Sequence, residues 1–248
     1  GVSLESSKWA DVLQEDGHDI FWFSGLSDRD PGSTALVPKA HFEDPEIARL
    51  HESIWGKEEF SEDLIAGVDR LRRALRGEIL DFISRFEVDV LVPQNALTIP
   101  MNIPLGLAIS DVIEKTDITT IAQHHDFYWE RDRFTGNAVQ RWLDEAFPPS
   151  HPSISHVVIN TAAQRDLKER CGIRSTVIPN VMDFEKPAPQ PAYSKEKIWE
   201  MIGLNPTDRM ILQPTRIIPR KGIELSIELL SRLNNPHLKL VISHDSGD

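Results

Sequence analysis

Residues 211–230 read ILQPTRIIPRKGIELSIELL. An apolar run ends at about Leu212, and an amphipathic helix is predicted to begin at about Gly222. Between them, Arg216 and Lys221 stand in a turn that contains proline. Two cations between the carboxyl end of a strand and the amino end of a helix favour phosphate binding, because positive side chains and backbone N–H groups meet there. The stretch predicts an anionic ligand such as a sugar nucleotide, although two basic residues that only solvate a loop would have the same spacing.

The helix after Gly222 leads into a second strand, predicted at residues 238–242, LKLVI. Strand, crossover helix and strand form the unit of an open α/β sheet, in which ligands bind at the carboxyl ends of the strands. By its three-and-four spacing, the helix places four apolar residues on one face: Ile223, Ile227, Leu230 and Leu233.

The rest of the chain alternates between the same two patterns, which predicts an α/β protein. Thr161 is expected to cap the helix that follows it. Strands are predicted at residues 19–24, 88–92, 119–123, 157–160 and 176–178, with a short extended piece at 35–37. Helices are predicted at residues 4–15, 47–86 (as one or two helices), 101–115, 162–171 and 195–202.

Composition sets the class of protein. A chain of 248 residues with 40% hydrophobic and 27% charged residues is typical of a globular protein with an ample core. The formal net charge of -12 argues against nucleic acid as a partner. Cys171 is the single cysteine, which excludes an internal disulfide and fits a reducing cytosol. No apolar run is long enough for an integral membrane segment, so we expect a cytoplasmic protein.

A second polar segment, residues 123–134, reads QHHDFYWERDRF. It follows a predicted strand, so its first side chains should emerge at the carboxyl edge of the sheet. Histidine can donate to phosphate or sugar oxygens, and the charged and aromatic residues after it suit sugar hydroxyls and rings. Other interpretations stay open: a metal site at His124, His125 and Asp126 is weakly indicated, the charged residues would also form a salt-linked turn, and the aromatic residues would also fit a core.

In combination, four motifs resemble those of retaining glycosyltransferases with the GT-B fold, and within them the GT4-like group (glycosyltransferase group 1). The motifs are GVSL at residues 1–4, QHHDF at 123–127, VIPNVMD at 177–183, and Arg216 with Lys221-Gly222. The resemblance implies a Rossmann-like amino-terminal domain followed by the beginning of a second Rossmann-like domain. It also implies hexosyl transfer from a nucleotide diphosphate sugar to a polar small-molecule or glycan hydroxyl acceptor, with no metal and no other cofactor.

The resemblance also implies roles for particular residues. Arg216 and Lys221 would neutralise the donor diphosphate and stabilise the leaving nucleotide. His124 would lie near the transferred sugar, and Gly1 would let the backbone approach the donor. Acceptor-side residues would be Asn102, which would serve equally well as a helix cap, and Asp126, Glu130, Arg131 and Arg133.

Two departures from the family pattern are expected to matter. The chain begins inside the glycine loop and ends after the second strand of the second domain. We therefore expect an acceptor-side domain at 1–184 without its first strand, a proline-rich linker at 185–207, and the start of a donor-binding domain at 208–248. Such a piece should be inactive alone, because a shared site needs both domains, and its open sheet edges should promote self-association.

Three other functions share parts of this pattern. A GT-B epimerase or phosphorylase would have the same architecture and would be separated from a transferase by product analysis. The resembled family has a carboxylate-bearing motif later in its second domain, which contacts the donor. A noncatalytic carbohydrate- or nucleotide-binding module would lack that motif. A nucleotide-binding oxidoreductase is disfavoured, because no complete Gly-x-Gly-x-x-Gly follows a strand.

Overall fold

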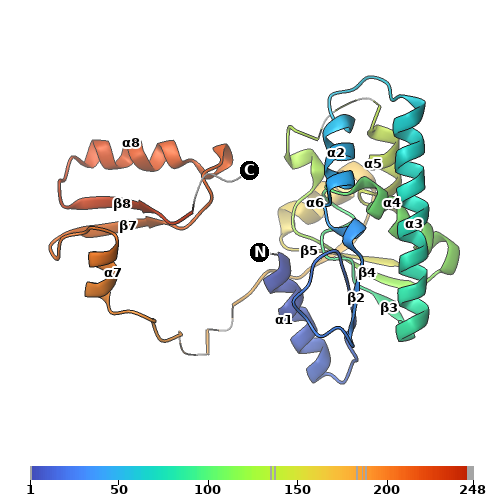
Figure 1. The fold of residues 1–248 in the computed structure, drawn as a ribbon, viewed down its shortest axis with the longest axis horizontal. Helices are drawn as coiled ribbons and strands as arrows, with labels where there is room; N and C mark the ends of the chain where they lie inside the picture. Colours follow the sequence, from blue (N-terminus) through green and yellow to red (C-terminus); the bar gives the residue numbers. More distant parts are fainter. Residues whose placement is uncertain are drawn as a thin grey trace. The chain divides into compact units, whose positions relative to one another are not determined.

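A computed structural model describes residues 2–134, 136, 138–182, 184–185, 187 and 189–244 (Figure 1). The chain forms two compact units, Gly1–Met182 and Asp183–Asp248. The first unit ends two residues before the boundary expected from the sequence. The stretch 185–207, expected to be a linker, is grouped with the second unit. The acceptor and donor roles of the two units stay predictions.

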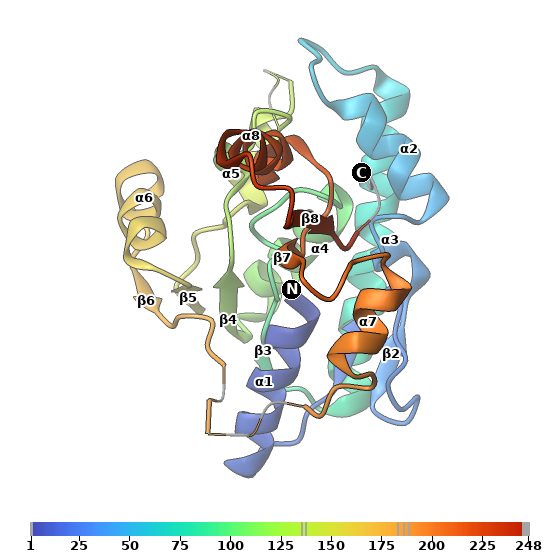
Figure 2. The ribbon, with the colours of Figure 1, turned by 90° about the vertical axis from the view of Figure 1, so that its left-hand side faces the viewer.

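A four-stranded sheet forms the centre of the first unit. Its strands run in the order β3 (Val90–Leu91), β4 (Thr119–His124), β5 (Ile154–Val158) and β6 (Ser175–Val177), all parallel. Figure 2 shows this order across the sheet, with β6 at one edge. A separate parallel pair joins β1 (Trp22–Ser24) to β2 (Thr34–Leu36). The parallel sheets with helical crossovers confirm the α/β class.

Helices surround this sheet. They are α1 (Val2–Glu15), α2 (Pro45–Ile54), α3 (Glu62–Phe86), α4 (Ile103–Thr116), α5 (Gln140–Ala146) and α6 (Thr161–Cys171), with 3-10 turns η1 (Pro38–Ala40) and η2 (Tyr128–Glu130). The region 47–86 is thus two helices, separated near Gly56, which has a φ of 70°. The short helix α5 was not predicted.

The long helix α3 shows how sequence determines these elements. The Ser61 hydroxyl accepts a hydrogen bond from Leu64 N at 3.3 Å and caps the first turn. Glu87 ends the helix in the left-handed conformation. The side chains at three- and four-residue spacing between these ends are buried: Val68, Leu71, Leu75, Ile79 and Phe82. Leu75 and Ile79 of this stripe pack in one cluster with residues of α4 and the sheet, and Figure 1 shows the α3 ribbon beside α4.

Close packing of α4 depends on Gly106. A Cβ atom at this position would overlap the ring of Phe147, which follows α5 and is 1% exposed. The absence of a side chain lets the Phe147 ring lie against the α4 backbone. The same cluster contains Trp142 and Leu143 of α5, so packing against α4 accounts for the formation of this short helix.

One cap differs from the prediction. Asn160, rather than Thr161, caps α6, because its Oδ1 accepts a hydrogen bond from Ala163 N at 2.8 Å. Thr161 is the first residue of the helix. The preceding strand therefore ends at Val158 instead of reaching 160. Cys171, at the other end of α6, is a free, exposed thiol.

The second unit contains a strand, a crossover helix and a second strand that is parallel to the first. Strand β7 (Arg209–Gln213) pairs in parallel with β8 (Leu238–Ile242), and η3 (Pro219–Lys221) and α8 (Ile223–Leu233) connect them. Helix α7 (Lys195–Met201) precedes β7, and its Trp199 donates from Nε1 to the Asp208 carbonyl at 3.4 Å. The expected apolar face of α8 is only partly covered: Ile223 is buried and Leu230 half-buried, whereas Ile227 and Leu233 are exposed.

Candidate functional site

Polar side chains meet at the carboxyl edge of the first unit's sheet. Asn95 follows β3, His125 and Asp126 follow β4, and Asn180 follows β6. Asn95 Oδ1 accepts a hydrogen bond from His125 N at 3.0 Å, and its Nδ2 donates to Asp126 Oδ1 at 3.3 Å. Asn180 Nδ2 lies 3.3 Å from His125 Nδ1. We call these residues, with Arg131, the carboxyl-edge cluster.

The backbone of Asn95 is in a sparsely populated conformation. Its φ is 59°, a left-handed value that few residues other than glycine adopt. The Asn95 N–H donates to the Gln123 carbonyl at 2.9 Å, and the side chain holds the start of the 125–126 loop. Such conformations concentrate at ligand sites, where the surrounding hydrogen bonds maintain them.

His125 is the member of the cluster best suited to bind a ligand. Its Nε2 is buried and has no hydrogen-bond partner among the described residues. Burial lowers the pKa of His125, and the neighbouring Asp126 opposes that effect. A neutral imidazole with one unused nitrogen can exchange a hydrogen bond with a sugar hydroxyl.

Asp126 and Arg131 form a pair within the cluster. Arg131 Nη2 contacts Asp126 Oδ2, while Asp126 Oδ1 accepts from Asn95. Both oxygens of Asp126 are therefore engaged, and Arg131 is half-buried. The pair orients the loop and leaves further N–H groups of the guanidinium available to an anionic ligand.

Three acceptor-side candidates have structural contacts. Glu130 Oε1 accepts from Phe127 N at 2.9 Å at the start of η2. Asn102 caps α4 through Leu105 N at 3.1 Å and donates to the Lys39 carbonyl at 2.9 Å. Arg133 Nη2 contacts Met101 Sδ at 3.2 Å. The structure does not bring these residues into the carboxyl-edge cluster, and their acceptor role stays a prediction.

His124 faces the interior of the sheet. It is 1% exposed, its Nδ1 hydrogen-bonds Thr98 Oγ1, and its Nε2 lies 2.9 Å from His156 Nδ1. Burial and the neighbouring His156 hold the pKa of His124 well below its usual range. Both ring nitrogens are thus occupied, so the geometry favours His125 over His124 as the group that meets a ligand.

In the second unit, Arg216 and Lys221 lie in the connection from β7 to α8. Both are exposed, and neither forms an ion pair with a carboxylate in the part of the chain that the structure describes. Gln213 Nε2 donates to the Lys221 carbonyl at 2.9 Å and fixes the end of η3. No side chain caps α8, whose first N–H groups follow Gly222.

Two polar atoms that the sequence did not reveal lie at the end of β7 and at the start of the connection that follows it. Gln213 Oε1 and Thr215 Oγ1 are buried and have no hydrogen-bond partner among the described residues. Unpaired polar atoms in the same segment as two exposed cations are consistent with a polar ligand there. Gly1, also expected at the donor site, and Asp183 of the 177–183 motif lie outside the described residues.

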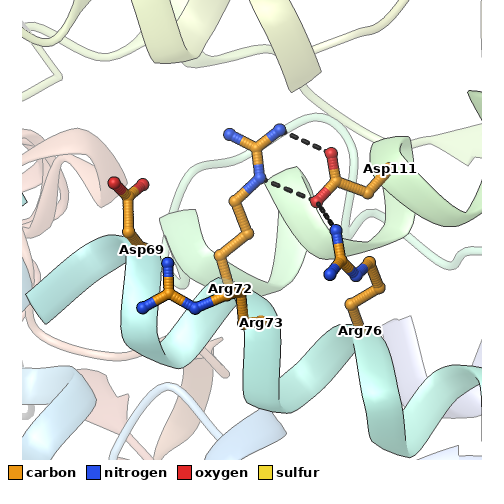
Figure 3. Close-up of a pocket in the computed structure, with 5 residues that line it drawn as sticks. All are labelled: Asp69, Arg72, Arg73, Arg76 and Asp111. Atoms are coloured by element: carbon orange, nitrogen blue, oxygen red, sulfur yellow. Dashed lines mark hydrogen bonds and ion pairs between the residues drawn. The ribbon is translucent and has the colours of Figure 1, made fainter. Parts of the chain in front are cut away.

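A hollow of about 260 Å³ on the first unit has a different character (Figure 3). Arg72 of α3 binds Asp111 of α4 through Nε and Nη2, at 2.8 and 2.5 Å, and also pairs with Glu145 of α5. Arg76 lies 3.6 Å from Asp111. The hollow, lined also by Asp69 and Arg73, is bridged by ion pairs that join three helices, so we interpret it as structural.

Neither a metal site nor a membrane helix is found in the described ranges. No three His, Cys, Asp or Glu residues there are grouped to hold a metal ion. None of the helices in those ranges combines the length and apolar character that crossing a bilayer requires.

Comparisons with known proteins relate the chain to two synthases. It is 35% identical over 242 residues to the mannosylglucosylglycerate synthase of Thermotoga maritima, covering 94% of this chain and 54% of that protein. It is 30% identical over 250 residues to the protein of the same name from Petrotoga mobilis, covering 97% and 56%. The chain is a relative of these enzymes. It spans about half of their length.

A shorter similarity extends to a third synthase. The mannosylglucosyl-3-phosphoglycerate synthase of Petrotoga mobilis is 31% identical over 146 residues, 51% of this chain and 26% of that protein. No protein-family model matches the chain.

Proposed function

We propose that the whole protein is a glycosyltransferase that moves a hexosyl unit from a nucleotide diphosphate sugar to a hydroxyl acceptor. The observation that carries this proposal is similarity along 94% and 97% of the chain to two mannosylglucosylglycerate synthases. Their name suggests a mannosyl unit as the transferred sugar and a glucosylglycerate as the acceptor. The small polar acceptor expected from the sequence agrees with such a compound.

The donor diphosphate is assigned to the β7–α8 connection. Arg216 and Lys221 would offset its charge, the free N–H groups of α8 would bind its oxygens, and Thr215 would donate from its unpaired hydroxyl. When the glycosidic bond breaks, negative charge grows on the nucleotide. Positive groups already in place stabilise that charge without reorganisation.

The carboxyl-edge cluster is assigned to sugar or acceptor hydroxyls. His125 has the unused nitrogen, Asn95 and Asn180 hold the loops, and Arg131 would meet the glycerate carboxylate. A GT-B arrangement with retained anomeric configuration is part of the proposal. It rests on the motif resemblance and is supported by parallel α/β sheets in both units.

The test is product analysis with the whole protein. GDP-mannose and a panel of UDP- and ADP-sugars are incubated with glucosylglycerate, and products are identified by mass spectrometry and by the anomeric couplings in NMR spectra. We expect one hexosyl unit to be added with the donor's anomeric configuration. Inversion would refute the retaining assignment, and hydrolysis or epimerisation of every donor without transfer would refute the transferase itself.

A further inference from the structure

A second hollow, of about 760 Å³, lies between α6 and the start of β6. We call it the α6 pocket. Ser175 is the first residue of β6, whereas Asn180 of the carboxyl-edge cluster follows the other end of that strand. The pocket is therefore at the opposite end of β6 from the cluster. Its lining residues are Gln164, Arg165, Lys168, Glu169, Arg174 and Ser175.

Helical spacing places the charges together. Arg165, Lys168 and Glu169 lie three and four residues apart on α6, and Arg174 enters from the turn before β6. Three cations and one carboxylate give the lining a net charge of +2, in a chain with a net charge of -12. The pocket is thus a local positive region on an acidic molecule.

These cations lack the partners that other basic residues of the unit have. Within the described part of the chain, no ion pair joins Arg165, Lys168 or Arg174 to a carboxylate. By contrast, Lys39 and Arg72 each form ion pairs with two carboxylates. Three cations share the lining with one carboxylate, Glu169, so their mutual repulsion is only partly offset, and a bound anion would reduce it further.

The polar groups of the pocket also fit an oxyanion. Ser175 Oγ is buried and has no hydrogen-bond partner among the described residues, so rotation about its Cα–Cβ bond would let it donate to a ligand. Gln164 Nε2 donates to the Ser175 carbonyl at 2.7 Å and fixes the helix to the strand at this point. Guanidinium groups bind the oxygens of phosphate in pairs.

We propose that the α6 pocket binds a small polyvalent anion that carries phosphate groups, at a site formed by other residues than those of the candidate donor and acceptor sites. Its volume falls in the range of small-molecule sites, about 300–1,000 Å³. Free polyphosphate and a phosphorylated metabolite share this chemistry. The proposal does not depend on the transferase function.

The test is an NMR titration of the ¹⁵N-labelled protein with pyrophosphate and, in a second arm, a sugar monophosphate. We expect saturable shifts of the amide signals of residues 164–175, weaker at higher salt. The stronger ligand of the two identifies the source of the phosphate. No saturable shift of these signals with either ligand up to roughly 10 mM, an affinity too weak for a specific site, would overturn the proposal.

Variants locate the effect. Arg165→Gln and Arg174→Gln should each weaken pyrophosphate binding by about tenfold, the loss expected for one charge-assisted hydrogen bond. Arg170→Gln is the matched control, because Arg170 is on the same helix but contacts the ring of Trp129 outside the pocket lining. All three side chains are exposed, so the fold should persist. Equal weakening by Arg170→Gln would contradict the assignment.

Discussion

At the scale of single residues, the pair His124 and His156 links stability to pH. One arrangement of protons satisfies all three hydrogen bonds of this series: Thr98 donates to His124, His124 donates to His156, and His156 donates to the Pro149 carbonyl. This arrangement requires both rings to be neutral. Burial lowers the pKa of His156 to about 4, from an ordinary value of 6.5.

We expect acid to destabilise the first unit through this pair. The unfolded chain binds protons that the folded pair excludes, so stability present above pH 6.5 is lost as the pH falls toward 4. For His156 alone the loss approaches about 3 kcal/mol. Urea unfolding at about pH 7 and pH 5 measures the part of this loss that falls between those pH values, about 2 kcal/mol.

His156→Gln, which can still accept from His124, should reduce the difference between the two pH values. His18→Gln, at an exposed histidine, is the control and should leave the difference unchanged. An unaltered pH dependence in His156→Gln would show that this pair does not carry the effect.

Lys221 tests the donor site at the same scale. In the whole protein, Lys221→Ala should lower kcat/KM about 10- to 100-fold, because a charge that stabilises the leaving nucleotide is removed. Steady-state kinetics with varied donor measures the change. Lys197→Ala is the matched control, since Lys197 is in the same unit and its ion pair is with exposed Glu200. Equal kinetics of the two variants would remove Lys221 from the phosphate site.

His125 tests the carboxyl-edge cluster. His125→Ala should lower kcat/KM by about tenfold or more through loss of one sugar hydrogen bond, while the melting temperature changes little because the ring is only half-buried. His18→Ala controls for removal of an exposed histidine. Full activity of His125→Ala would transfer the sugar contact to another residue of the cluster.

At the scale of elements, two glycines in neighbouring helices should respond oppositely to the same change. Gly106→Ala should destabilise the protein by about 1–3 kcal/mol, because the new methyl group overlaps the Phe147 ring. Gly77→Ala in α3 meets no atom within 4 Å and should stabilise it by roughly 0.5–1 kcal/mol. Urea unfolding of both variants measures the contrast, and effects of the same sign would contradict this account of α4 packing.

Most elements could be predicted from sequence, because periodic apolar residues and caps are local signals. Helix α5 could not, since its seven residues form a helix through contacts of Trp142 and Leu143 with distant side chains. Part of the candidate site could also be predicted from sequence, because polar residues were expected to follow the strand that became β4. The sequence could not show whether His124 or His125 faces a ligand, because that depends on the strand's orientation in the sheet. In the structure, His124 packs against His156, which leaves His125 for the ligand side.

The same rule would have found Asn95. It follows the strand predicted at 88–92 after a proline and a glutamine, at the same carboxyl edge of the sheet as His125. The sequence signal at Asn95 was a polar residue shortly after a predicted strand. It was weaker than the signal at 123–134, because asparagine has neither the charge nor the aromatic ring of the residues there. The unpaired atoms of Gln213 and Thr215 had no sequence signal, because hydrogen-bond satisfaction depends on side-chain placement.

At the scale of the whole molecule, the two units differ in buried surface. Among the described residues of the second unit, only Asp208 and Ile223 are buried. We therefore expect amides of β7, β8 and α8 to exchange hydrogen faster than those of α3, α4 and β4, which line the first unit's core. Hydrogen exchange followed by mass spectrometry tests this, and equal protection would show that the second unit gains stability from contacts beyond its own core.

A single surface thiol makes the molecule simple to tag. Because Cys171 is the one cysteine of these 248 residues and is exposed at the last turn of α6, a maleimide dye would attach to this chain at one defined place. That place is on the helix that supplies Arg165 and Lys168. A change in the emission of such a dye on addition of pyrophosphate would give a second readout of the binding proposed for the α6 pocket.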